Sequence, residues 1–217
     1  MDTPFEIHWP YLALALAMLW FPRPWMRLGR WRRKHRRERE TMEKFAQDGA
    51  VDPEDKSVRL ARELKSPRNH LDFLRALAGG VALWEFSFSA GRAQHGLLLG
   101  WEFGLTLVAI LIQLVRWRAR ITFFAPIFYF AGLSIGMGNY FSGSMAFLLM
   151  CALNPVIPTP RVFISVFAVL LLPFNYFLGA GLELALINSV LLLVGPLLSL
   201  LTERPMVIFT RKRNLMW

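Results

Sequence analysis

Residues 82–107 read ALWEFSFSAGRAQHGLLLGWEFGLTL, and this stretch decides the fold. Two apolar runs flank the short polar segment SAGRAQHG, and each run extends far enough to supply the roughly 20 apolar residues of a membrane-spanning helix. The tripeptide Trp-Glu-Phe occurs once in each run, which places Glu85 and Glu102 at similar distances from the turn. The stretch therefore predicts a hairpin of two transmembrane helices, each carrying a carboxylate at matched depth.

The composition extends this prediction to the whole chain. Of its 217 residues, 55% are hydrophobic and only 18% are charged, whereas a soluble domain carries roughly 45–50% apolar and about 25% charged residues. Much of the basic charge falls in residues 23–75, and residues 76–115 and 121–202 carry few charges. This distribution predicts an all-α, polytopic membrane helix bundle.

The apolar runs predict about seven transmembrane helices. The first has an apolar core of only 13 residues, and it reduces the count to six if it does not cross. The fifth is ended early by prolines and could instead form a re-entrant element. The expected spans are residues 5–22, 71–89, 97–115, 121–139, 141–157, 161–179 and 182–202.

Arginine placement predicts the topology. With seven spans, the basic clusters all fall on one side of the membrane, and the four segments on the other side contain one arginine and no lysine. Cytoplasmic loops carry an excess of Lys and Arg, so we expect the N-terminus outside and the C-terminus in the cytoplasm, in a plasma or bacterial inner membrane. The predicted organisation is a first membrane segment (1–22), a basic cytoplasmic helical segment (23–70), a six-helix membrane bundle (71–202) and a basic cytoplasmic tail (203–217).

The sequence RWRRKHRRERETMEKF at residues 30–45 predicts a strongly basic helix. Its charge has two interpretations, a topology signal or a surface that binds anionic lipid head groups. Nucleic acid is not an expected partner, because no recognition fold accompanies the charge. The candidate lipid-binding residues are Arg30, Arg32, Arg33, Lys34, Arg36 and Arg37.

Helical periodicity assigns two faces to the span 97–115. Gly96, Gly100 and Gly104 recur at every fourth residue, a small-residue stripe of the kind that lets two helices approach closely. The opposite face carries Glu102 and continues with polar or small residues to Gln113. Packing alone does not require a polar stripe of this length, so the stripe predicts a polar path.

Other spans contribute polar residues to the same prediction. The expected transport path or ion site consists of Glu85, Glu102, Thr106, Gln113, Asn139, Asn175 and Asn188. Arg92, His95 and Glu183 lie near the same membrane boundary and are possible charge partners. Whether the two path glutamates converge depends on which helix packs against the glycine stripe.

The acid pair has three interpretations. Each glutamate could be structural and pair with an arginine or an asparagine near the interface, where the cost of a charge is modest. The pair could bind a proton or a cation in a transport path. It could also act in acid–base catalysis or bind a partner subunit. A single cysteine and four histidines without metal spacing predict no metal site, and no nucleotide-binding fingerprint or other cofactor motif is present.

Our leading prediction is a small transporter or channel-like protein that moves a proton, a cation or a small solute, with Glu102 as its charged residue. The alternative is a non-catalytic subunit or assembly factor of a larger membrane complex, in which the polar stripes bind partners or a second copy. A lipid-modifying membrane enzyme is a further alternative, and Glu85, Glu102 and Glu183 are its only candidate groups.

Overall fold

The computed structural model describes residues 4–23, 58, 60–117, 121–157, 159–179, 181–204 and 206–208. The described chain is mainly helical, as predicted. Its helices are α1 (Trp9–Trp20), α3 (Leu60–Glu63), α4 (Pro67–Val81), the π-helix η2 (Ala82–Phe86), the 3-10 turn η3 (Arg92–Gln94), α5 (His95–Leu114), α6 (Ile127–Gly136), α7 (Tyr140–Leu153), α8 (Pro160–Phe177) and α9 (Gly181–Leu201).

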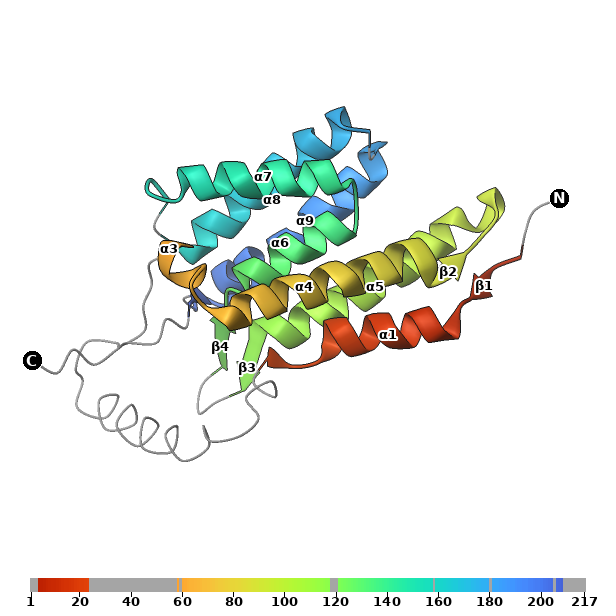
Figure 1. The fold of residues 1–217 in the computed structure, drawn as a ribbon, viewed down its shortest axis with the longest axis horizontal. Helices are drawn as coiled ribbons and strands as arrows, with labels where there is room; N and C mark the ends of the chain where they lie inside the picture. Colours follow the sequence, from red (N-terminus) through yellow and green to blue (C-terminus); the bar gives the residue numbers. More distant parts are fainter. Residues whose placement is uncertain are drawn as a thin grey trace, which may run out of the picture.

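The longer helices lie side by side along the long axis of the molecule (Figure 1). At one end, β1 (Glu6–Ile7) pairs antiparallel with β2 (Phe88–Ser89). At the other end, β4 (Ile121–Phe124) lies between β3 (Val115–Trp117), to which it is antiparallel, and β5 (Met206–Val207), to which it is parallel. We call these the β1–β2 end and the β3–β5 end.

Three described helical segments are long and apolar enough to cross a membrane. They are Arg92–Leu114, Pro160–Phe177 and Gly181–Leu201. Three further apolar helices are shorter, with 10–17 residues: Trp9–Trp20, Ile127–Gly136 and Tyr140–Leu153. The all-α fold is therefore confirmed, together with helices suited to a membrane.

The predicted helix over residues 121–139 is shorter than expected. Residues 121–124 form strand β4, and α6 covers only 10 residues, about 15 Å of helix. Pro126 explains the late start, because the residue before a proline favours an extended backbone. Every residue of α6 is buried, so this short helix forms the centre of the bundle.

Helices α4 and α6 pack closely through glycines. A Cβ atom on Gly132 would lie 2.2 Å from the Phe73 carbonyl oxygen, and one on Gly136 would lie 2.6 Å from the Leu77 carbonyl oxygen. Only a residue without a side chain permits this approach. Gly132 and Gly136 therefore form the seam between α4 and α6.

The glycine stripe of α5 differs from its predicted role. A Cβ atom added to Gly96, Gly100 or Gly104 would meet no described atom within 4 Å. Trp101 and Val108, beside the stripe, are also exposed. Within the described chain, no helix therefore packs on this face of α5, and the polar face opposite is the one turned inward.

Candidate functional site

A cavity of about 510 Å³ lies at the β1–β2 end of the bundle, between η2, the first half of α5, the end of α6 and the start of α9. Four of its lining residues are titratable: Glu85, His95, Glu102 and Glu183. Most of the remaining wall is apolar and is formed by Trp84, Phe88, Leu98, Leu99, Met137, Leu182 and Leu184. We call it the acidic cavity.

Glu102 is the buried acid of this cavity. It is only 2% exposed, because it lies on the inward face of α5. No described residue donates a hydrogen bond to its carboxylate or forms an ion pair with it. A buried charge without a partner is costly, so this carboxylate is available to a proton or to a cation in the cavity.

The mouth of the acidic cavity is open. His95 and Glu183 face each other there, with 3.2 Å between His95 Nε2 and Glu183 Oε2, and their side chains are 58% and 71% exposed. Leu182 beside them is also exposed. Exposed side chains from α5 and α9 therefore form the rim of the cavity.

Glu85 reaches the cavity from the π-helical segment η2, at the end of α4. Short π segments within helices are frequent at functional sites. The segment ends where Ser87 donates a hydrogen bond from Oγ to the Ala82 carbonyl oxygen at 2.7 Å, and the backbone N–H of His8 donates to the Ser87 carbonyl oxygen. This pairing with the N-terminal strand fixes the wall that carries Trp84 and Glu85.

A hydrogen-bonded plug lies beyond Glu102. Trp84 Nε1 donates to Thr106 Oγ1 at 3.2 Å, and Thr106 Oγ1 donates to the Glu102 carbonyl oxygen at 2.7 Å. Thr106 is fully buried, as are Ala109 and Ile110 one turn further along α5. The polar stripe of α5 is therefore continuous in sequence but closed by packing below the cavity.

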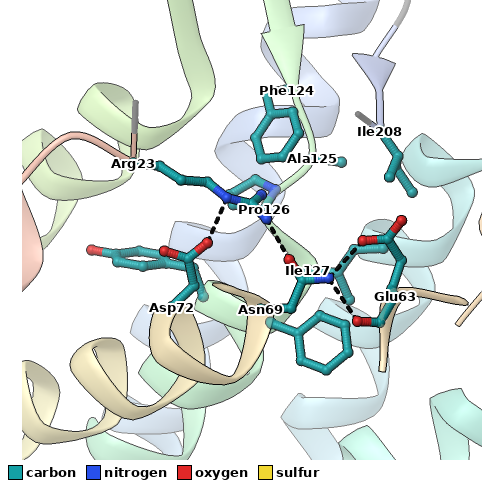
Figure 2. A pocket seen from close by; sticks show the side chains of 11 residues that line it. Arg23, Glu63, Asn69, Asp72, Phe124, Ala125, Pro126, Ile127 and Ile208 are labelled. Carbon is teal, nitrogen blue, oxygen red and sulfur yellow. Dashed lines mark hydrogen bonds and ion pairs between the residues drawn. The ribbon is translucent and has the colours of Figure 1, made fainter. Parts of the chain in front are cut away.

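A second polar cluster fills the β3–β5 end. It consists of Arg23, Glu63, Asn69, Asp72, Arg75, Gln113 and Tyr129, and we call it the polar latch. Figure 2 shows the part around Arg23, whose side chain points to Asp72 and Asn69. Asp72 forms an ion pair with Arg23, with 2.6 Å between Arg23 Nε and Asp72 Oδ2, and accepts a hydrogen bond from Arg75 Nε at 3.0 Å. Asn69 Nδ2 donates to Glu63 Oε2 at 2.6 Å.

The latch binds the C-terminal carbonyls of α1. This helix stops because Pro22 follows Phe21, which leaves carbonyl oxygens without helical partners. Arg75 donates to the carbonyl oxygens of Met18 and Phe21, Gln113 Nε2 donates to those of Leu19 and Phe21, and the Tyr129 hydroxyl donates to that of Leu19. Side chains from α4, α5 and α6 thereby hold the C-terminal end of α1 in place through hydrogen bonds.

The latch is paired and densely packed. Arg75 also donates from NH2 to Gln113 Oε1 at 3.0 Å, and the Arg23 guanidinium lies 4.8 Å from the ring centre of Phe124. Burial lowers the pKa of the Arg23 guanidinium while Asp72 and Glu63 oppose that shift, and an arginine still keeps its charge. The space left among these side chains is about 10 Å³, no more than one water requires.

The β3–β5 end has a further closure between α8 and α9. Arg161, at the start of α8, donates from NH2 to Ser199 Oγ at 2.9 Å and to the Arg204 carbonyl oxygen at 3.3 Å. Ser199 is fully buried and its hydroxyl donates to the same Arg204 carbonyl oxygen. The bundle is thus closed by paired polar groups at this end and is hollow at the other.

The three asparagines of the predicted path lie near the turn between α6 and α7. Asn139 caps α7 by accepting from the Phe141 N–H, and it donates to the Leu178 carbonyl oxygen. Asn188 Nδ2 donates to the Ser134 carbonyl oxygen at 3.2 Å, whereas Asn188 Oδ1 and both amide atoms of Asn175 have no partner among the described residues. Asn139 is therefore a structural cap. Asn188 is buried with an unpaired amide oxygen, and Asn175 is buried with both amide atoms unpaired among the described residues.

The predicted site residues fall into five places. Glu85 and Glu102 share the acidic cavity with two predicted charge partners, His95 and Glu183. Thr106 belongs to the plug below the cavity, and Gln113 belongs to the latch. The asparagines form the group just described, and Arg92 is exposed on η3 and does not line the cavity.

Sequence reasoning missed the latch. Arg75 belongs to a basic cluster that predicts topology, and Asp72 has no predicted role, although their spacing of three residues places both on one face of a helix. That spacing was the available signal. The predicted lipid-binding residues Arg30, Arg32, Arg33, Lys34, Arg36 and Arg37 lie outside the described residues.

No protein-family model, curated protein or solved structure matches this chain. Its function is therefore inferred from the geometry of the acidic cavity and the latch.

Proposed function

We propose that this chain is a small multi-pass transporter that moves a cation or a proton through the acidic cavity. One observation carries the proposal: Glu102 is buried and unpaired in a cavity open at one end of the bundle, while the other end is closed by paired groups. An intramembrane carboxylate is costly and by default marks an ion or substrate pathway.

The proposal places seven helical segments in the membrane, with the short and fully buried α6 enclosed by the others, and with the N-terminus and the acidic cavity on the outer side. Exposed apolar side chains support the membrane location, because they occur on short helices as well as long ones. Trp9 on α1 and Phe141 on α7 are each 68% exposed, and Val169 on α8 is 62% exposed. Exposed apolar surface on this scale is rare on soluble monomers and is expected of helices that face lipid.

Transport requires the closed end to open in turn. In the proposed cycle, the described structure is the outward-open state, and the latch and the Arg161–Ser199 contact form the cytoplasmic gate. A ligand that neutralises Glu102 changes the balance between the two ends, since a ligand shifts a conformational equilibrium only by binding one state more tightly.

Proteoliposomes test the proposal. The purified chain is reconstituted with a pH-sensitive or a Na⁺-sensitive dye inside, and the matching proton or Na⁺ gradient is imposed. We expect flux above that of protein-free liposomes, and we expect Glu102→Gln to abolish the excess. Glu203→Gln is the matched control, because it makes the same chemical change on an exposed acid beyond the end of α9. Equal flux in wild type and Glu102→Gln would reject the mechanism.

A second candidate function is a subunit of a larger membrane complex. It is favoured by the open glycine face of α5, where Gly96, Gly100 and Gly104 have no described neighbour. Small-residue faces of this kind support close helix–helix association in membranes. Purification in mild detergent tests it: a stoichiometric partner or a second copy that is lost on Gly100→Leu supports the subunit function, and a stable monomer rejects it.

A further inference from the structure

We propose that the ligand of the acidic cavity is a bulky, largely apolar organic cation, such as a quaternary ammonium or phosphonium compound. This proposal rests on the transport function above and names the class of its substrate. It follows from three properties of the cavity: the separation of its acids, the nature of its wall and its size.

The titratable side chains of the cavity lie too far apart to bind one small metal ion together. Glu85, His95, Glu102 and Glu183 all line it, yet no three Asp, Glu, His or Cys side chains among the described residues are grouped to hold a metal. A hard cation such as Ca²⁺ needs 6–8 oxygen ligands at about 2.3–2.6 Å. The negative charge is instead spread around the space, which suits a cation of larger diameter.

The wall between the acids is apolar. Trp84 and Phe88 contribute aromatic side chains from one side, and Leu98 and Leu99 contribute aliphatic ones from α5. A hydrated inorganic ion gains nothing from such a wall, whereas an organic cation buries its carbon groups there. Aromatic side chains also attract cations, and quaternary ammonium ligands are commonly recognised in this way.

The size and the charge fit the same class. A volume of about 510 Å³ falls within the roughly 300–1,000 Å³ of sites for drug-sized ligands. The buried Glu102 supplies a negative charge opposite the positive charge of the ligand. The ligand in turn supplies the ion-pair partner that Glu102 lacks among the described residues. Glu85 and the exposed Glu183 add negative charge nearer the mouth, which attracts cations and repels anions.

Binding of two matched ions tests the proposal. Tetraphenylphosphonium and tetraphenylborate have almost the same size and shape and carry opposite charges. Each is titrated into the full chain in detergent, with protein-free micelles subtracted, and binding is followed by calorimetry and by tryptophan fluorescence. We expect saturable binding of tetraphenylphosphonium and none of tetraphenylborate. Tetramethylammonium and Na⁺, which lack the apolar surface, should compete only weakly.

Variants assign the binding to the cavity. We expect Glu102→Gln to weaken tetraphenylphosphonium binding at least about tenfold, and Glu203→Gln to leave it unchanged. Glu85→Gln is a second variant on an exposed residue that does not threaten folding, and we expect a smaller loss of affinity. Equal binding of both ions, or binding that Glu102→Gln does not affect, overturns the proposal.

Different experimental results would reject the proposed ligand class and the proposed transport function. Proton or Na⁺ flux that depends on Glu102, without binding of tetraphenylphosphonium, overturns the ligand class and supports transport of a small ion. Binding of tetraphenylphosphonium that depends on Glu102, with no flux of that cation above the leak of protein-free liposomes, supports the ligand class and rejects transport.

Discussion

Asp72 and Glu102 are carboxylates of equal burial, each 2% exposed, at opposite ends of one helical bundle. Asp72 lies in the polar latch and forms ion pairs with two arginines, with 2.6 Å to Arg23 Nε and 3.0 Å to Arg75 Nε. Glu102 lies in the acidic cavity and receives no hydrogen bond or ion pair from the residues described. The comparison separates two kinds of buried carboxylate: the protein itself supplies the partners of Asp72, whereas Glu102 has none among the described residues and our proposal assigns it to a ligand.

The difference predicts opposite signs for the same chemical change. Removing one partner of a buried, paired charge leaves the others uncompensated. Removing an unpaired charge relieves a desolvation cost. Stability measurements on the chain without ligand can therefore distinguish the two ends without knowledge of the substrate.

The largest expected effect is that of Asp72→Asn. The change leaves the guanidinium groups of Arg23 and Arg75 without their carboxylate partner, and we expect the free energy of unfolding to fall by about 3–5 kcal/mol. Reversible unfolding in mixed micelles measures this loss. An effect as small as that of the exposed control Glu203→Gln, within about 0.5 kcal/mol, would show that the latch does not hold the bundle closed.

A pair of glycine substitutions sharpens the comparison between filled and open parts of the molecule. Gly132→Ala places a methyl group 2.2 Å from the Phe73 carbonyl oxygen, and we expect a loss of about 1–3 kcal/mol from overpacking. Gly100→Ala meets no described atom within 4 Å, and we expect a gain of about 0.5–1 kcal/mol from the better helix propensity of alanine. The same unfolding assay compares them, and a loss at Gly100 as large as that at Gly132 would indicate that a partner covers the α5 face.

The change in stability with the most informative sign is that of Glu102→Gln. Without ligand, we expect the free energy of unfolding to rise by up to about 2 kcal/mol, because a buried carboxylate without a partner becomes a neutral amide of the same shape. The gain should disappear when tetraphenylphosphonium saturates the wild-type chain, since binding to the folded state stabilises it. A clear loss of stability would mean that Glu102 has a structural partner.

Much of the local structure could be predicted from the sequence. The periodicity of α5 correctly placed Glu102, Thr106 and Gln113 on a buried face opposite the glycines. Pro126 and the glycines that follow it also carry the sequence signal for the short helix α6. Helical periodicity and prolines are local properties, so they can be read from a single sequence.

The partners of each face could not be predicted in this way. Two glycine stripes look alike in sequence, yet Gly132 and Gly136 contact α4 while the stripe of α5 has no described neighbour. The latch joins Arg75 to Met18, 57 residues away, and Gln113 to Leu19, 94 residues away. Contacts across such distances depend on how the helices are arranged, which the spacing within one helix does not contain.

Cysteine accessibility tests the central claim most directly. In a Cys151→Ser background, Leu99→Cys places a thiol in the wall of the acidic cavity, and Leu114→Cys places one at a fully buried site on the same helix. Membrane-impermeant thiol reagents with positive or negative charge are added to the outer side of intact vesicles. We predict that the thiol at position 99 reacts about tenfold or more faster with the cationic reagent, that Glu102→Gln reduces this preference, and that position 114 does not react. Equal rates for the two reagents, or no reaction at position 99 from the outer side, would contradict an open, acidic cavity built around Glu102.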